Sequence, residues 1–227
     1  MSERSEPLLR HAPATFHGRF LVDVPPAPAS PHCWLVGFHG YAQSAQIFLP
    51  LLTRATRSDA WLTAAVQAPH PFYTRGDRSI VANWMTREDR ELAIPDNIGF
   101  VDSVLDQLHA EFGAPRAIVF LGFSQGAAMA YRAGLCGKRR AAAIFSVCGD
   151  VPPDVRDLPR ERWPLVRMIT GTTDEWYPPT RMDDEAAIVR AIGATVETSS
   201  FEGGHEFSAA AVDALGTLLA QTEAAAR

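Results

Sequence analysis

The five residues Gly122-Phe123-Ser124-Gln125-Gly126 constrain the fold of this chain more than any other segment. An apolar, β-rich run at 118–121 precedes them, and a helical pattern at 127–135 follows. A strand that passes into a helix over so few residues must turn sharply, and the two glycines lack the Cβ atoms that would clash there. The pattern predicts a strand, a tight turn and a helix, with the hydroxyl of Ser124 presented as a nucleophile. An ordinary glycine-rich turn is the alternative.

The rest of the chain alternates short apolar runs with longer amphipathic segments. Such alternation predicts a mainly parallel sheet with helices on both faces, in one α/β domain over residues 1–227 with a less ordered segment at 1–15. The expected strands are 16–24, 33–38, 61–68, 118–122, 141–147, 165–170 and 195–201. The expected helices are 47–56, 96–112, 127–135, 183–192 and a terminal helix, with Asp96 and Ser208 as caps and Asp183 and Asp184 at a helix start. We expect loops at 69–95 and 151–164.

The composition is that of a globular protein, with 47% hydrophobic residues, 21% charged residues and a formal net charge of -5. Proteins that bind nucleic acid through their charge are normally basic, so nucleic acid is not an expected partner. The three cysteines are separated and indicate neither a disulfide framework nor a zinc site, so no metal or other cofactor is expected. No apolar stretch reaches the length of a membrane span, and we expect a cytoplasmic protein without membrane insertion. A homodimer is compatible with the sequence.

A serine hydroxyl is a weak nucleophile and needs a base to accept its proton. His205 follows two glycines directly after the last expected strand, where a loop would deliver it to the sheet edge that carries Ser124. The base needs a carboxylate that fixes its tautomer. Asp174 follows the expected strand 165–170, and the order Ser124, Asp174, His205 is that of α/β-hydrolases. Asp150, which follows the preceding strand, is the alternative acid.

Attack on a carbonyl places negative charge on its oxygen, so hydrogen-bond donors must already point at that position. The backbone N–H of Gln125, directly after the nucleophile, is one candidate. A second donor is expected in the loop that follows strand 33–38, where Gly40 permits a close backbone approach. Tyr41 N–H is the first choice and Ala42 N–H the second, while His39 is expected to brace this loop.

The motifs together resemble the phospholipase/carboxylesterase family of α/β-hydrolases, which includes acyl-protein thioesterases and small bacterial carboxylesterases. The resemblance covers nearly the whole chain after residue 16 and is carried by four segments in family order: His39-Gly40-Tyr41-Ala42-Gln43, Gly122-Phe123-Ser124-Gln125-Gly126, Gly171-Thr172-Thr173-Asp174 and Gly203-Gly204-His205. It implies Ser124, Asp174 and His205 as a catalytic triad, Tyr41 and Gln125 as oxyanion donors, and no cofactor. It also implies activity on short or medium acyl esters, lysophospholipids or acylated thiols. The chain departs from many relatives at Trp176, where they carry smaller aliphatic residues, and this tryptophan is expected to reshape the acyl pocket.

An apolar acyl group needs an apolar lining, and aromatic residues in the strand-end loops are the candidates. They are Tyr41, Phe48, Tyr73, Trp84, Trp176 and Phe207, with Trp84 and Trp176 favoured because they lie in expected loops. No strong positive cluster marks these loops, which argues against a highly anionic substrate. The sequence therefore predicts a serine hydrolase that cleaves small-molecule carboxylic esters or thioesters. Lysophospholipase, amidase or peptidase activity with the same triad is the alternative, followed by a non-catalytic binding protein of the same fold.

Overall fold

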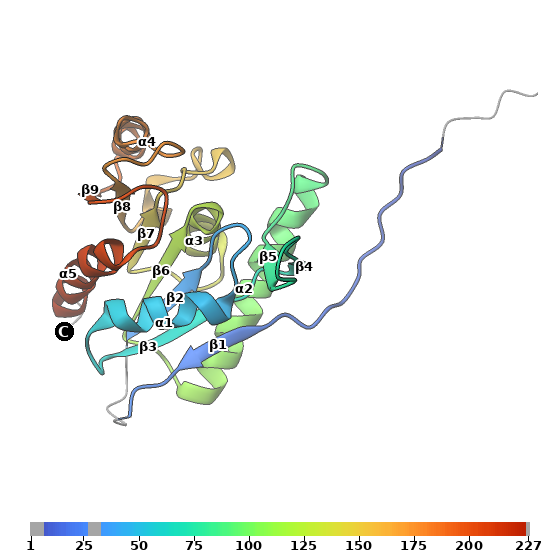
Figure 1. Cartoon of the computed structure of the whole chain (residues 1–227), viewed down its shortest axis with the longest axis horizontal. Coiled ribbons are helices and arrows are strands. Elements are labelled where there is room, and N and C mark those ends of the chain that lie inside the picture. Colours follow the sequence, from blue (N-terminus) through green and yellow to red (C-terminus); the bar gives the residue numbers. More distant parts are fainter. Residues whose placement is uncertain (1–6, 27–32, 226–227) are drawn as a thin grey trace, which may run out of the picture.

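A central sheet of seven strands runs through the protein, whose computed structural model describes residues 7–26 and 33–225. Its strand order is β1-β3-β2-β6-β7-β8-β9, and all neighbours are parallel except β1, which pairs antiparallel with β3 (Figure 1). The strands are β1 (Phe20–Asp23), β2 (Cys33–Phe38), β3 (Trp61–Val66), β6 (Ala117–Phe123), β7 (Ala143–Val147), β8 (Leu165–Gly171) and β9 (Val196–Phe201). The inner strands are buried on both faces, which explains why they appear in the sequence as continuous apolar runs.

Helices cover both faces of the sheet and divide the core into two layers. The helices are α1 (Ala45–Thr56), α2 (Arg90–Phe112), α3 (Gln125–Cys136), α4 (Pro179–Ala191) and α5 (Ala209–Ala225). The layer under α2, α3 and α4 contains Trp34, Phe38 and Phe120. The layer under α1 and α5, which lie side by side, contains Leu35 of β2 and Phe145 of β7 (Figure 1). Alternate residues of β2 therefore face opposite layers, as a doubly covered sheet requires.

These elements confirm the α/β-hydrolase fold and most of the expected strands. The terminal helix begins after Ser208, whose Oγ accepts a bond from Ala211 N–H at 3.4 Å. The strand expected at 16–24 is shorter, because residues 7–19 form neither helix nor strand. Residues 1–6 of the segment expected to be less ordered lie outside the described residues. No helix in the described part of the chain is long and apolar enough to cross a membrane.

The expected loop at 69–95 is wrong, because it contains a hairpin of β4 (His70–Tyr73) and β5 (Ile80–Asn83). Pro71 argues against a strand in this segment, because proline has no N–H to donate to a neighbouring strand. However, β4 is an edge strand of a two-stranded sheet, and a proline is tolerated where its missing N–H faces away from the partner.

Asp96 does not cap α2, which begins six residues earlier with Asp89 as its N-cap. Pro95 lies inside this helix and is exposed, so the carbonyl that loses its N–H partner can bind water. Asp183 and Asp184 likewise lie inside α4, which starts at Pro179. The segment 151–164 is mainly loop, as expected, with 3₁₀ turns at Pro153–Val155 and Arg160–Arg162.

Candidate active site

Ser124 lies in the sharp turn between β6 and α3, as the sequence predicts. Its backbone has φ 52° and ψ -119°, which a residue with a side chain adopts only when its surroundings enforce it. Its N–H donates to Val147 O at 2.9 Å, and its carbonyl accepts from Ala127 N–H at 2.9 Å. A Cβ at Gly122 would lie 2.1 Å from Gly126 O, so the turn closes only around a glycine. The turn leaves the Ser124 hydroxyl at the start of α3, facing the loop that follows β9.

His205 lies within hydrogen-bond distance of Ser124. Its Nε2 is 2.8 Å from Ser124 Oγ, and the loop that carries it follows β9. This loop packs directly on the end of β8, where a Cβ at Gly171 would lie 2.4 Å from the carbonyls of Gly203 and Gly204. Gly171 therefore permits the approach of the two loops that carry Asp174 and His205.

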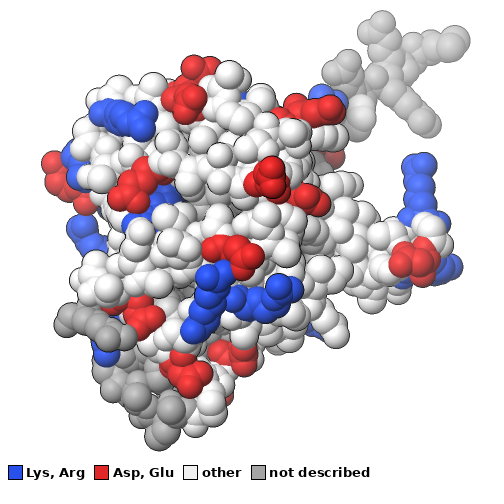
Figure 2. Space-filling model, turned by 60° about the vertical axis from the view of Figure 1, so that its left-hand side comes forward, with Lys and Arg blue, Asp and Glu red and all other residues white. Residues whose placement is uncertain are grey.

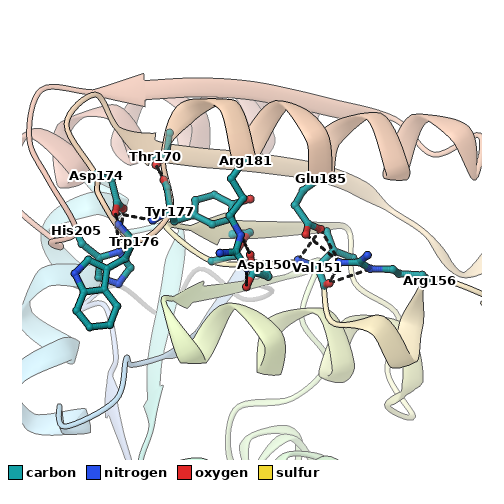
Figure 3. A network of polar contacts seen from close by, with 12 residues as sticks. Asp150, Val151, Arg156, Thr170, Asp174, Trp176, Tyr177, Arg181, Glu185 and His205 are labelled. Atoms are coloured by element: carbon teal, nitrogen blue, oxygen red, sulfur yellow. Dashed lines mark hydrogen bonds and ion pairs between the residues drawn. The ribbon is translucent and has the colours of Figure 1, made fainter.

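Asp174 forms the far end of this hydrogen-bonded chain. Its Oδ2 and Oδ1 lie 2.9 and 3.1 Å from His205 Nδ1, and Oδ1 also accepts from the backbone N–H groups of Trp176 and Tyr177 (Figure 3). The alternative acid, Asp150, instead forms a two-pronged ion pair with Arg181 at 2.6 and 2.7 Å. Figure 3 shows this pair apart from the contact between Asp174 and His205. The geometry thus joins Asp174, and not Asp150, to the histidine.

Asp174 is held as a carboxylate although it is buried. Burial opposes its ionisation more than any other single effect, but the hydrogen bonds from Tyr177 N–H, His205, the Cys148 thiol and Trp176 N–H together lower its pKa. Cys148 is a residue that sequence analysis did not single out. Burial raises the pKa of its thiol to about 12, so it remains an S–H donor toward Asp174. Ligand atoms of Cys148, Asp174 and His205 lie within 4.8 Å of one another, yet a thiol that stays protonated is a poor metal ligand.

Backbone bonds fasten successive strand ends to one another along this edge of the sheet. Ser124 N–H, after β6, donates to Val147 O of β7, and Cys148 N–H, after β7, donates to Ile169 O of β8. Thr172 N–H, after β8, donates to Phe201 O of β9, and all three distances are 2.8–2.9 Å. We refer to these three bonds as the strand-end ladder. It connects the segments that carry Ser124, Asp174 and His205 to one rigid sheet.

The two backbone N–H groups expected to bind the carbonyl oxygen have no acceptor among the described residues. They belong to Tyr41 and to Gln125, the first residue of α3, where the helix dipole also favours negative charge. The second choice, Ala42, is wrong as a donor because its N–H already binds Ala82 O at 3.0 Å. Gln125 N–H directly follows the nucleophile and is a free donor at the start of α3, and Tyr41 N–H is a free donor in the loop that follows β2.

Buried polar contacts hold the loop that carries Tyr41. His39 is fully buried, with Nδ1 at 2.8 Å from Gly40 O and Nε2 accepting from Ala68 N–H at 3.0 Å, and burial lowers its pKa. The indole N–H of Trp84 donates to His39 O at 2.8 Å. The Gln125 side chain accepts a hydrogen bond from Trp84 N–H, which connects the segment of Trp84 to the start of α3. His39 therefore braces the loop, as expected.

A cavity of about 570 Å³ opens beside Ser124 and His205, which is ample for a small ester. Of the aromatic residues expected to line it, Trp84 and Trp176 do. Trp84 is fully buried, whereas Trp176 is 78% exposed and lies at the rim, with its ring 6.1 Å from that of His205. Residues that sequence analysis missed complete the lining, including Met85, Ala128, Pro152, Pro153 and Tyr177.

The remaining aromatic candidates do not line this cavity. Phe48 and Phe207 are buried and pack edge to face at a centroid distance of 4.9 Å, so they belong to the core layer under α1 and α5. Tyr73 is exposed on the β4–β5 hairpin, and Tyr41 packs on Phe72 of the same hairpin. Their aromatic character alone could not separate core packing from substrate contact.

The expectation that no positive cluster marks the strand-end loops is also wrong. Arg87, Arg90, Arg132 and Arg181 all line the cavity. They come from three segments far apart in the sequence, so no basic run reveals them. Acidic and basic side chains are interspersed over the face shown in Figure 2.

Several solved structures share this fold. Esterase PE8 is 24% identical, with a TM-score of 0.67 over 90% of this chain and 98% of that one. SOBER1 from Arabidopsis thaliana is 19% identical, with a TM-score of 0.68 over 85% and 99% of the two chains. A carboxylesterase from Bacillus cereus is 16% identical, with a TM-score of 0.69 over 90% and 94%. A comparison with curated protein sequences gives no match.

The family model for phospholipases and carboxylesterases matches residues 77–222, which is more than half of the chain. The matched span contains the turn at Ser124 and both loops that bring Asp174 and His205 to it. Together with the fold, this match extends the similarity from architecture to the segments that form the site. The chain therefore belongs to the phospholipase/carboxylesterase family of α/β-hydrolases.

Proposed function

We propose that the protein is a serine esterase that hydrolyses carboxylic esters or thioesters through an acyl-enzyme intermediate. The observation that carries this proposal is the unbroken hydrogen-bonded chain from Ser124 Oγ through His205 to Asp174, beside a cavity of about 570 Å³. A nucleophile bonded to a base that is in turn oriented by a carboxylate is the arrangement that activates a serine.

The reaction follows from these contacts. His205 Nε2 accepts the proton of Ser124 as Oγ bonds to the carbonyl carbon, and Asp174 stabilises the imidazolium that forms. Tyr41 N–H and Gln125 N–H bind the oxygen that gains negative charge. His205 then donates the proton to the departing alcohol or thiol, and a water activated by the same histidine releases the acid. The mechanism requires that His205 begin the cycle as a neutral imidazole.

Labelling with a fluorophosphonate probe, alongside hydrolysis of p-nitrophenyl esters, tests this proposal. We expect wild type to be labelled and Ser124→Ala to lose both labelling and about 10⁶-fold of the turnover, as removal of a triad nucleophile does in other serine hydrolases. Ser103→Ala is the matched control, because Ser103 lies exposed on α2 and its hydroxyl only contacts Gly99 O. If Ser124→Ala retained wild-type hydrolysis, the proposed mechanism would be wrong.

A further inference from the structure

Two arginines on one wall of the cavity lack a matching carboxylate. Arg87 makes no ion pair or hydrogen bond with any residue that the structure describes. Arg90 has only a long contact of 3.8 Å with Asp154 Oδ1. That oxygen already accepts from Arg132 at 2.7 Å, and Arg132 also donates to Asp154 Oδ2 at 2.9 Å. Asp154 is therefore committed to the buried Arg132, and Arg90 remains largely uncompensated.

The other charges near the cavity do not neutralise this wall. Asp150 lines the same cavity but is paired with Arg181, at 2.6 and 2.7 Å. Glu88 and Asp89, which lie between the two arginines in sequence, line a separate cavity with Phe16 and Leu92. Among the described residues, Asp150 is the one carboxylate that lines the cavity with Ser124, and Arg181 holds it.

The position of Arg90 is unfavourable for the helix that carries it. Arg90 is the first residue of α2, where the helix dipole favours anions and disfavours cations. The positive end of the helix dipole and the two guanidinium groups together make the electrostatic potential at this wall of the cavity positive. Asp89 and Glu91 at the same helix start compensate the dipole, but the two guanidinium groups remain without a close carboxylate in a substrate-sized cavity, which fits an anionic ligand.

We propose that the physiological substrate carries a carboxylate, which Arg87 and Arg90 bind while the ester carbonyl lies at Ser124. This inference rests on the proposed esterase function and narrows it to esters with an anionic group on one side of the scissile bond. Guanidinium groups bind carboxylates through paired hydrogen bonds and discriminate against neutral groups of the same length. Trp84, Met85 and Pro152 contribute apolar surface for the carbon chain between the two ends.

The test compares esters that differ only in this charge. The acyl arm pairs mono-4-nitrophenyl adipate with 4-nitrophenyl hexanoate, and the leaving-group arm pairs 4-carboxyphenyl hexanoate with phenyl hexanoate. We expect wild type to prefer the charged member of one pair in kcat/KM, and the arm that responds identifies the side that carries the anion. Raising the salt concentration should reduce the preference, because exposed charges are screened.

The double variant Arg87→Gln/Arg90→Gln should lower this preference about tenfold, since each exposed ion pair changes an equilibrium by a factor of roughly two to five. Its activity on the neutral esters should stay within about twofold of wild type, which shows that the site is intact. Arg190→Gln is the matched control, because Arg190 is exposed in the last turn of α4 and does not line the cavity.

Equal rates on both members of each pair in wild type, or a preference that the double variant retains, would overturn the inference. Hydrolysis of the neutral esters that depends on Ser124 would still support the proposed esterase function. If wild type were neither labelled by the fluorophosphonate probe nor able to hydrolyse any of these esters, both this inference and the proposed esterase function would be overturned.

Discussion

Substitution of Gly126 by alanine tests whether the site depends on the close approach of α3 to the end of β2. A Cβ at this position would lie 2.1 Å from Phe38 O and 2.6 Å from His39 O, whereas ordinary contacts begin at 3.4 Å. The obstructing atoms are backbone, so the end of β2 must move by more than about 1 Å. Such overpacking lowers the free energy of unfolding by about 3 kcal/mol, which corresponds to a decrease in Tm of roughly 6–12 °C for a chain of this size.

The same movement of the end of β2 shifts the loop that follows it, and this changes the distance between Tyr41 N–H and Gln125 N–H. We expect kcat/KM for a p-nitrophenyl ester to fall about 10²-fold, because a misplacement of about 1 Å is enough for a loss of that size. Thermal unfolding and steady-state kinetics measure the two effects. Gly99→Ala is the control, since a Cβ there meets nothing within 4 Å and a helical alanine should stabilise the protein by about 0.5–1 kcal/mol. A Gly126→Ala variant with wild-type Tm and turnover would refute this reasoning.

The remaining predictions concern His39 and Asp174. His39→Phe leaves the buried donor at Ala68 N–H without a partner and removes the ring contact with Gly40 O, which still accepts from Gln43 N–H, and should lower the free energy of unfolding by about 1–3 kcal/mol in urea titrations. His109→Phe, at an exposed position on α2, should change it by less than about 0.5 kcal/mol, and equal effects of the two substitutions would contradict the bracing role. The folded protein lowers the pKa of Asp174 below 3.8, so ionised Asp174 stabilises the fold above that pH and this contribution disappears as the pH falls further. Unfolding of wild type and Asp174→Asn should therefore differ most above pH 3.8 and converge as the pH falls below it, and a difference that stays constant well below pH 3.8 would disprove the linkage.

The sequence predicted the structure best where the local residues permit only one backbone arrangement. The turn at Ser124 needs two glycines and a serine between an apolar strand and a helix, so its elements and the exposed hydroxyl could be predicted from five residues. β2 has the predicted bounds because all six of its residues are buried, which makes it a continuous apolar run. Asp174 and His205 could be predicted because parallel strands bring their carboxyl ends to one edge.

Features that depend on tertiary contacts could not be predicted in this way. The prolines at 71 and 95 suggested loop, but an edge strand and a solvated helix side tolerate them. Phe48 and Phe207 are as apolar as any pocket residue, and only their packing against each other assigns them to the core. The arginines of the cavity come from separate segments, so their convergence appears only once the chain is folded.

The strand-end ladder has a consequence for how this enzyme can change over evolution. The three bonds fix the segments of Ser124, Asp174 and His205 to the sheet, whereas Arg87 and Arg90 lie on peripheral segments outside it. Substitutions in those peripheral segments alter what enters the cavity without moving the strand ends. Different parts of the fold therefore hold the proposed triad and the side chains proposed to select the substrate. A few substitutions at the rim of the cavity are enough to change which esters it accepts.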